Sequence, residues 1–338
     1  MKTIPRPAPR HLRKILQSAS LSVLLMLSAP LLSQEEPEPA KNAEEAPAEP
    51  SGRPMILTGV DAEAIARKRP DTAVWLTDDE QERVLALFQP ERESPAKGAL
   101  VILADEGESA ASGLADALRE PLSRAGWAVM TLGLPTPPYP VQQWLQRQGN
   151  ARPEIAGAET LEAKAGEDAA ASVMINVMDA EAPNAELNQY RDKVVSSLNA
   201  AVNALSEREY GRIVLAGVGR AAGHVTRQAR EDGRASDLIW IAPHFYADES
   251  SGLTELLASA ASPSILELYS TFPADTALAR SAEARASALE RAGISGYQRQ
   301  PAAMARQPQP RSAGMLANRI TAWLGSTSKG PIADGAGQ

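Results

Sequence analysis

The sequence has no cysteine among its 338 residues, only three histidines and few aromatic residues. Without cysteine the chain can form no disulfide, no thiolate metal site, no cysteine nucleophile and no lipid-modified cysteine. The histidines, His11, His224 and His244, are too few for a histidine-rich metal site. Aromatic residues make up 4%, which argues against stacking platforms for single-stranded nucleic acid. We therefore expect no cofactor and no metal.

Residues 1–33 have the order of a signal peptide. Five basic residues come first, an apolar stretch from Ile15 to Leu32 follows, and no acidic residue precedes Glu35. Polar residues interrupt the apolar stretch, which makes it a poor membrane span, although an uncleaved anchor stays open. We predict export to the periplasm of a Gram-negative type of cell, with membrane attachment only through an uncleaved N-terminal segment.

The chain is acidic, and more so without this segment. The whole sequence has 34 basic and 42 acidic residues, a net charge of −8; without residues 1–33 the balance is 29 against 42, or −13. Such a protein repels phosphate backbones, so nucleic acid is not an expected partner. The partners that remain are an unknown small molecule or an envelope protein.

Composition also predicts the domain boundaries. Residues 34–54 are rich in Pro, Glu and Ala, with no large apolar residue before Met55, which predicts a disordered linker. One domain follows at 55–325, with a polar surface insertion at about 146–170. Residues 326–338 are small and polar and predict a disordered tail.

Within the domain, strand-like and helical patterns alternate. Apolar runs of strand length lie at 83–88, 98–103, 126–132, 212–216, 237–242, 264–269 and 294–299. Helical spacing lies at 114–122, 187–205, 274–291 and 315–324, with a further helix opening near Ala222. This pattern predicts an α/β fold with a mostly parallel sheet covered by helices on both faces. Functional sites in such sheets lie at the carboxyl ends of the strands.

A glycine-rich turn, Gly217-Val218-Gly219-Arg220-Ala221, follows the strand at 212–216. A strand, a sharp turn and a helix in this order are the context of the hydrolase nucleophile elbow, G-x-S-x-G. Gly217 and Ala221 supply the small flanking residues, but Gly219 stands at the nucleophile position. Because glycine has no side chain, no acyl-enzyme can form there. Dinucleotide binding at this turn is disfavoured, since no first-strand βαβ unit precedes it.

From about Arg83 to Leu324 the chain resembles the bacterial domain of unknown function 3530 family. The resemblance is carried by residues 99–134 with Ala-Gly-Trp at 125–127, by the elbow at 215–223, and by Trp240 to Phe245. It implies an α/β-hydrolase-like fold and an exported bacterial protein, and it implies no established substrate.

The remaining members of a catalytic triad should follow the elbow as an acid and then a histidine. Asp275 follows the strand at 264–269, later than expected for the acid, and its place beside Pro273 is more typical of a helix N-terminus. The histidine should lie between Tyr297 and the last helix, and residues 298–310 contain none.

Other residues could serve a relocated site. His224 follows the elbow by five residues and His244 ends the strand at 237–242, although lone histidines are usually structural. The candidate serines are Ser109, Ser250 and Ser251. Near Ser109, the carboxylates of Asp105, Glu106 and Glu108 would oppose a developing oxyanion; together they could also hold a hard cation, though a solvated acidic loop fits their spacing better.

These observations leave three hypotheses. The leading one is a non-catalytic α/β-hydrolase-like protein that acts as a binding or envelope-associated module. The second is a hydrolase or esterase with a relocated serine, which needs a serine oxygen within hydrogen-bond reach of a histidine nitrogen. The third is a structural envelope protein that the linker at 34–54 spaces from the membrane. An open pocket beside Gly219, lined by residues 135–139 and 245–246, would favour a small-molecule ligand.

Overall fold

The structure, a computed structural model, describes residues 61–79, 81–150, 183–232, 235, 237–258, 263–271 and 276–327. The predicted signal peptide, the predicted linker, residues 151–170 of the polar stretch, Asp275 and residues 328–338 lie outside these ranges. None of the helices within them is long and apolar enough to cross a membrane.

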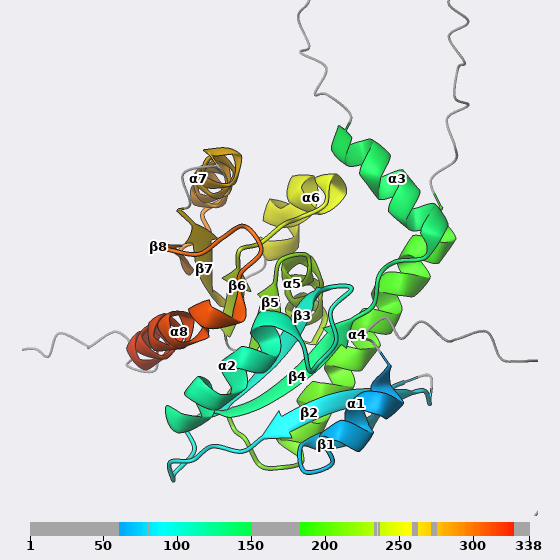
Figure 1. Ribbon diagram of the computed structural model, residues 1–338. Helices are drawn as coiled ribbons and strands as arrows, with labels where there is room; N and C mark the ends of the chain where they lie inside the picture. Colours follow the sequence, from blue (N-terminus) through cyan, green and yellow to red (C-terminus); the bar gives the residue numbers. More distant parts are fainter. Residues whose placement is uncertain are drawn as a thin grey trace, which may run out of the picture. The chain divides into compact units, whose positions relative to one another are not determined.

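Eight strands form one sheet, in the order β1-β2-β4-β3-β5-β6-β7-β8 (Figure 1). The strands are β1 (Ala73–Thr77), β2 (Arg83–Gln89), β3 (Ala99–Glu106), β4 (Ala128–Leu134), β5 (Ile213–Val218), β6 (Asp237–Ile241), β7 (Ser264–Ser270) and β8 (Tyr297–Ala302). β2 runs antiparallel to both of its neighbours, and the strands from β4 to β8 are parallel. This is the strand order of the α/β-hydrolase fold, and it confirms the predicted fold class.

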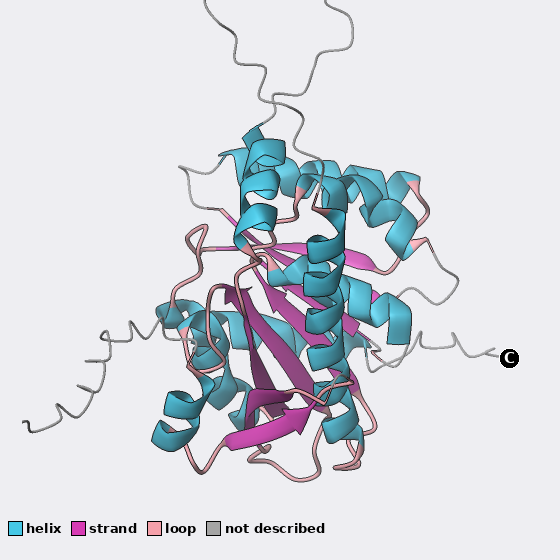
Figure 2. Ribbon diagram, turned by 90° about the vertical axis from the view of Figure 1, so that its right-hand side faces the viewer, coloured by secondary structure: helices cyan, strands magenta, loops and turns pink. Residues whose placement is uncertain are grey.

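Helices cover both faces of this sheet (Figure 2). α2 (Gly113–Arg124) and α8 (Ala313–Thr327) pack on one face, and α4 (Asn184–Ser206) and α5 (Ala221–Asp232) on the other. α6 (Ala247–Leu257) and α7 (Thr276–Arg291) add Leu253, Leu257 and Leu289 to the core between the sheet and the α4–α5 layer. The central strands are apolar throughout because successive side chains of a strand enter opposite cores.

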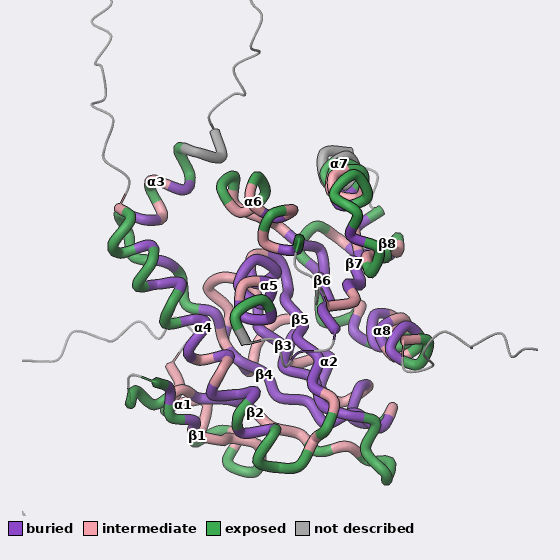
Figure 3. Tube along the Cα trace, turned by 180° about the vertical axis from the view of Figure 1, so that it is seen from behind, coloured by how far each residue is buried: buried purple, intermediate pink, exposed green. Residues whose placement is uncertain are grey.

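β3 shows this alternation most clearly. Val101 and Leu103 pack under α4 and α5, while Leu100 and Ile102 pack under α2 and α8, and all four are at most 1% exposed. In Figure 3 the buried residues follow the sheet and the inner sides of these helices, and the exposed residues lie on their outer turns. The carboxyl ends of β3, β5 and β6 therefore meet at one edge on a rigid, fully buried support.

Four elements have no counterpart among the predicted ranges. They are α1 (Ala62–Lys68), β1, α3 (Tyr139–Asn150) and α6, and a short 3-10 turn, η1 (Pro310–Ser312), precedes α8. α1 begins at Asp61, whose side chain accepts a hydrogen bond from the Ala64 N–H at 3.1 Å. Residues 146–150 of the predicted polar insertion form the end of α3, and α8 extends two residues beyond the predicted domain end at 325.

Candidate functional site

The turn between β5 and α5 has the backbone of a nucleophile elbow. A Cβ placed on Gly217 would lie closer than 3.0 Å to the backbone of Ala221 and Ala222, so the turn needs glycine there. Gly219 has a φ of +58°, in the left-handed region. Its N–H donates to the carbonyl of Ile241 at 2.9 Å, which ties the turn to the end of β6. The sequence thus builds the sharp turn and leaves out the nucleophilic side chain.

Asp105, at the end of β3, occupies the space beside Gly219. A Cβ placed on Gly219 would lie closer than 3.0 Å to three atoms of the Asp105 carboxyl group. Asp105 Oδ1 accepts hydrogen bonds from the N–H of Arg220 at 2.9 Å and from the N–H of Glu106 at 2.8 Å. In an active α/β-hydrolase, the N–H after the nucleophile and an N–H following β3 form the oxyanion hole. Here the Asp105 carboxylate accepts from the first of these positions, the N–H of Arg220, and from the N–H of Glu106, the last residue of β3.

The three carboxylates at the end of β3 and in the loop after it have different partners. Asp105 faces the elbow, Glu106 accepts a hydrogen bond from the Tyr246 hydroxyl, and the Glu108 carboxylate lies against Gly113. Burial raises the pKa of Glu106 and of Glu108 above the usual range. No cluster of three or more His, Cys, Asp or Glu that could bind a metal occurs within the described ranges.

His244 follows β6 directly above the elbow. Its backbone N–H donates to the Gly219 carbonyl at 3.0 Å, and the preceding Ala242 has a positive φ of +47°. Its Nε2 is buried and has no hydrogen-bond partner in the described part of the chain. Burial, reinforced by the positive charges of Arg306 and Arg220, lowers the pKa of His244 to about 4. The imidazole is therefore neutral at pH 7.

A cavity of about 460 Å³ opens beside His244. We call it the arginine cavity, because three of its lining side chains are arginines, namely Arg220 from the elbow, Arg285 from α7 and Arg306 from the segment between β8 and η1. None of the described residues that line it carries a carboxylate. Arg220 and Arg306 also line a neighbouring cavity of about 420 Å³, together with Glu106 and Tyr246.

The two cavities test the predicted pocket beside the elbow. Phe245 lines the arginine cavity and Tyr246 lines its neighbour, as expected for residues 245–246. Residues 135–139 line neither of them; α3 supplies Gln142, Leu145 and Gln146 to the neighbouring cavity instead.

His224 lies in α5 and is 2% exposed. Its ring meets the ring of Tyr190 edge-on at 5.4 Å between centroids. Both ring nitrogens are buried without a hydrogen-bond partner among the described residues. Burial and the nearby Arg191 and Arg227 lower the pKa of His224 to about 3, so the ring stays neutral.

The candidate serines do not meet these histidines. Ser109 is 5% exposed, and its Oγ accepts a hydrogen bond from the Ala111 N–H at 3.3 Å. Ser251 Oγ donates to the Asp248 carbonyl at 2.9 Å, and Ser250 is an exposed residue that lines the arginine cavity. Since both His224 nitrogens and His244 Nε2 are unpartnered, no serine hydroxyl reaches any of these three atoms within the described ranges.

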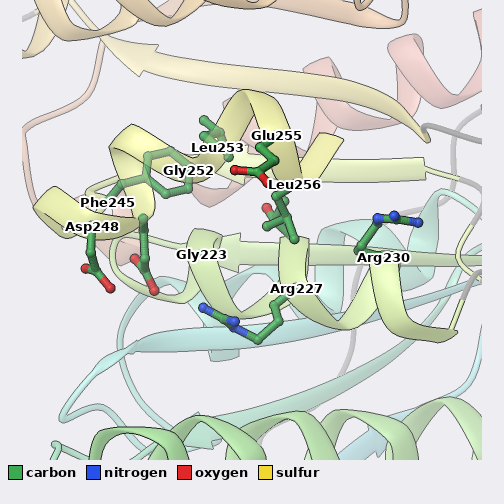
Figure 4. A pocket seen from close by; sticks show the side chains of 11 residues that line it. Gly223, Arg227, Arg230, Phe245, Asp248, Gly252, Leu253, Glu255 and Leu256 are labelled. Carbon is green, nitrogen blue, oxygen red and sulfur yellow. The ribbon is translucent and has the colours of Figure 1, made fainter. Parts of the chain in front are cut away.

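A third cavity, of about 370 Å³, lies between α5 and α6, and we call it the α5–α6 cavity. Figure 4 shows Arg227 and Arg230 projecting from α5, and Asp248 and Glu255 from α6. Its lining includes Glu249, whose pKa is raised, mainly by burial. Acidic and basic side chains are therefore mixed in this cavity.

Sequence reasoning missed Arg220 and Arg306 as site residues. Arg220 was visible inside the elbow motif, directly after Gly219. Arg306 lies in the 298–310 stretch that lacks the expected histidine, and it lines the arginine cavity together with His244. The sequence signal for Arg306 was thus a basic residue in the stretch where an α/β-hydrolase would carry its catalytic histidine.

A profile described as "Protein of unknown function (DUF3530)" matches residues 16–326. Among curated proteins, none matches the sequence. The similar solved structures include the esterase domain of a Rhodothermus marinus protein, which is 12% identical with a TM-score of 0.45 over 74% of this chain and 96% of that one.

Est1E from Butyrivibrio proteoclasticus is 9% identical with a TM-score of 0.46, and the match covers 76% of this chain and 99% of that one. Dienelactone hydrolase from Anabaena variabilis is 13% identical with a TM-score of 0.43, over 75% and 96% of the two chains. These similarities are too weak to say anything about the activity of this chain.

Proposed function

This chain belongs to the DUF3530 family, whose function is unknown, and we propose that it is a binding module on an α/β-hydrolase fold that does not hydrolyse esters. One observation carries the proposal. The Asp105 carboxylate takes the space of the nucleophilic side chain and accepts hydrogen bonds from Glu106, at the end of β3, and from Arg220, at the position of the oxyanion-hole donor that follows the nucleophile. A substrate carbonyl at this place would meet a negative charge where catalysis needs donors.

The missing general base of the triad supports the same conclusion. A general base must accept a proton at working pH, and an arginine guanidinium cannot be deprotonated in a protein. Arg306 takes the chain position of the late histidine, and the neutral His244 beside it has no hydrogen-bonded orienting group at Nε2. The relocated-serine alternative lacks the serine–histidine contact that it requires at the three unpartnered nitrogens.

Fluorophosphonate labelling together with turnover of 4-nitrophenyl esters tests the proposal. The reagent modifies an activated serine whatever the natural substrate, and ester turnover also detects a carboxylate nucleophile such as Asp105. We expect no adduct and no turnover above the uncatalysed rate for folded protein, beside a labelled control hydrolase. An adduct on one serine, or turnover that Asp105→Asn abolishes, would contradict the proposal.

We also propose that the module works in the periplasm or at the envelope. The motivating feature is the order of residues 1–33, basic and then apolar. Separation of periplasmic from cytoplasmic contents tests this step, and recovery of the chain in the cytoplasm with residues 1–33 intact would overturn it. A purely structural envelope role predicts that deleting residues 34–54 abolishes function in cells while the purified domain still folds.

A further inference from the structure

The arginine cavity has the composition of a ligand site. Cationic side chains line one part of it, and Pro243, Phe245, Ala284 and Ala288 supply an apolar wall. Its volume of about 460 Å³ is in the range of small-molecule pockets, which combine apolar walls with a few placed polar groups.

Two of the three arginines, Arg220 and Arg306, are not neutralised by an ion pair within the described ranges. Arg285 is neutralised by Glu267, which is 0% exposed and also accepts a hydrogen bond from the Tyr297 hydroxyl at 2.7 Å. Arg220 lies over the ring of Tyr246, 4.0 Å from its centroid, and Arg306 is exposed. Neither Arg220 nor Arg306 has an ion-pair partner within the described ranges.

Two acids lie near these two arginines, and neither lines the arginine cavity. Glu106 lines the neighbouring cavity, where it accepts a hydrogen bond from the Tyr246 hydroxyl, and burial raises its pKa. Asp105 accepts a hydrogen bond from the backbone N–H of Arg220, which leaves the guanidinium group of Arg220 to the cavity. At His244, three arginines act to lower the pKa and Asp105 alone among the charges acts to raise it. The field in the cavity is thus positive.

His244 supplies a polar group that lacks a partner. A buried polar atom without a hydrogen bond is costly, and most such atoms in native proteins have one. His244 lines the cavity, and its Nε2 is such an atom, shielded from solvent and without a hydrogen-bond partner in the described ranges.

We propose that the arginine cavity binds an organic oxyanion, a carboxylate or phosphate monoester on an apolar body. Arg220 and Arg306 hold the oxyanion, and the wall around Phe245 contacts the apolar body. Guanidinium groups suit this task because their donors match the oxygens of carboxylate and phosphate. The inference rests on the proposed function, since it assigns the ligand class of the same non-hydrolytic site.

Isothermal titration of the full chain with four six-carbon probes tests this inference. The probes are hexanoate, hexyl phosphate, neutral hexanol and cationic hexylammonium. We expect saturable binding of hexanoate or hexyl phosphate, and no saturable binding of hexylammonium. The ratio of the two anion affinities identifies the headgroup, and a preference for either supports the proposal.

The variants Arg220→Gln and Arg306→Gln should each weaken binding of the preferred anion roughly 10-fold or more, as loss of a charged hydrogen-bond donor does. Arg230→Gln removes the same charge from the α5–α6 cavity and should leave the affinity within about two-fold. Because Arg306 is exposed, its variant keeps the fold even if Arg220→Gln does not. Binding of hexylammonium as strong as that of the anions, or an unchanged affinity in Arg306→Gln, would overturn the inference.

Failure of this inference is distinguishable from failure of the proposed function. Absence of anion binding together with absence of ester turnover would overturn the ligand class alone. Ester turnover would overturn the proposed function whichever way the titration falls.

Discussion

The arginine cavity and the α5–α6 cavity are neighbours of similar size, but their charges are arranged differently. The α5–α6 cavity mixes Arg227 and Arg230 with acids of α6, whereas the described lining of the arginine cavity holds three arginines and no acid. The acids of the α5–α6 cavity offset the charge of its arginines, and Asp248 also pairs with Arg191 of α4 at 2.5 Å. The two cavities therefore differ in charge balance more than in volume, and we take the unbalanced positive charge of the arginine cavity as the mark of a ligand site.

The same contrast recurs inside the arginine cavity. Arg285 is anchored by a buried carboxylate, and its side chain is 11% exposed. Arg306 is exposed and unpaired within the described ranges. We assign Arg285 to the architecture of the cavity wall and Arg306 to ligand binding, so that only loss of the Arg285 ion pair should lower the stability of the fold.

The largest expected effect is that of Glu267→Ala. The substitution leaves the largely buried Arg285 guanidinium and the hydroxyl of the half-buried Tyr297 without their acceptor. Removing one partner of a buried ion pair costs about 3–5 kcal/mol of unfolding free energy. Urea denaturation measures this loss. The exposed Glu283 in α7 gives the matched control, and Glu283→Ala should stay within about 0.5 kcal/mol.

Arg306→Gln completes this comparison, and its unfolding free energy should also stay within about 0.5 kcal/mol of the wild type. A loss in Arg306→Gln as large as that in Glu267→Ala would show that both arginines belong to the wall. The assignment of Arg306 to a ligand would then be wrong.

A smaller effect is expected at the elbow. Gly219→Ser places a side chain at a φ of +58° and into the Asp105 carboxyl group, which should cost about 2–3 kcal/mol. Asp105→Ala alone loses two hydrogen bonds, about 1–2 kcal/mol. In the double variant the serine has room, so the combined loss should fall short of the sum by about 1 kcal/mol.

Chemical denaturation of these three variants gives the coupling between the two positions. Gly211→Ser is the matched control, because nothing lies within 4 Å of a Cβ placed there, and it should be close to neutral. Additive losses at Gly219 and Asp105 would mean that the two residues do not compete for the same space.

The sequence predicted the sheet well because the central strands are buried on both faces. β3, β5, β6 and β7 are mostly apolar, with Glu267 as the charged residue at the centre of β7, and each lies within a few residues of its predicted range. β1 was missed because it is a partly exposed edge strand with one fully buried residue, Leu76. α6 was missed because its first turn, with Asp248 and Glu249, is polar, and only Leu253 and Leu257 are buried.

The site was predictable only in its backbone. The spacing of the glycines predicted the elbow at residues 217–221. The chain order of a catalytic triad showed where a histidine was missing. The partner of Gly219 was not predictable, because Asp105 is 114 positions away and meets it only through the pairing of β3 with β5. Acidic residues were expected to oppose an oxyanion at this loop, but sequence alone could not show that one carboxylate would occupy the donors themselves.

The most direct measurement is amide hydrogen exchange at Arg220 and Glu106, in the wild type and in Asp105→Ala. We expect both N–H groups to be protected in the wild type, because Asp105 Oδ1 accepts from each of them. Protection should fall at these two positions in the variant and persist at Leu215 in the core of β5. Equally fast exchange of Arg220 and Glu106 in both proteins would mean that the donors are open in the wild type, as a working oxyanion hole requires, and would contradict the account.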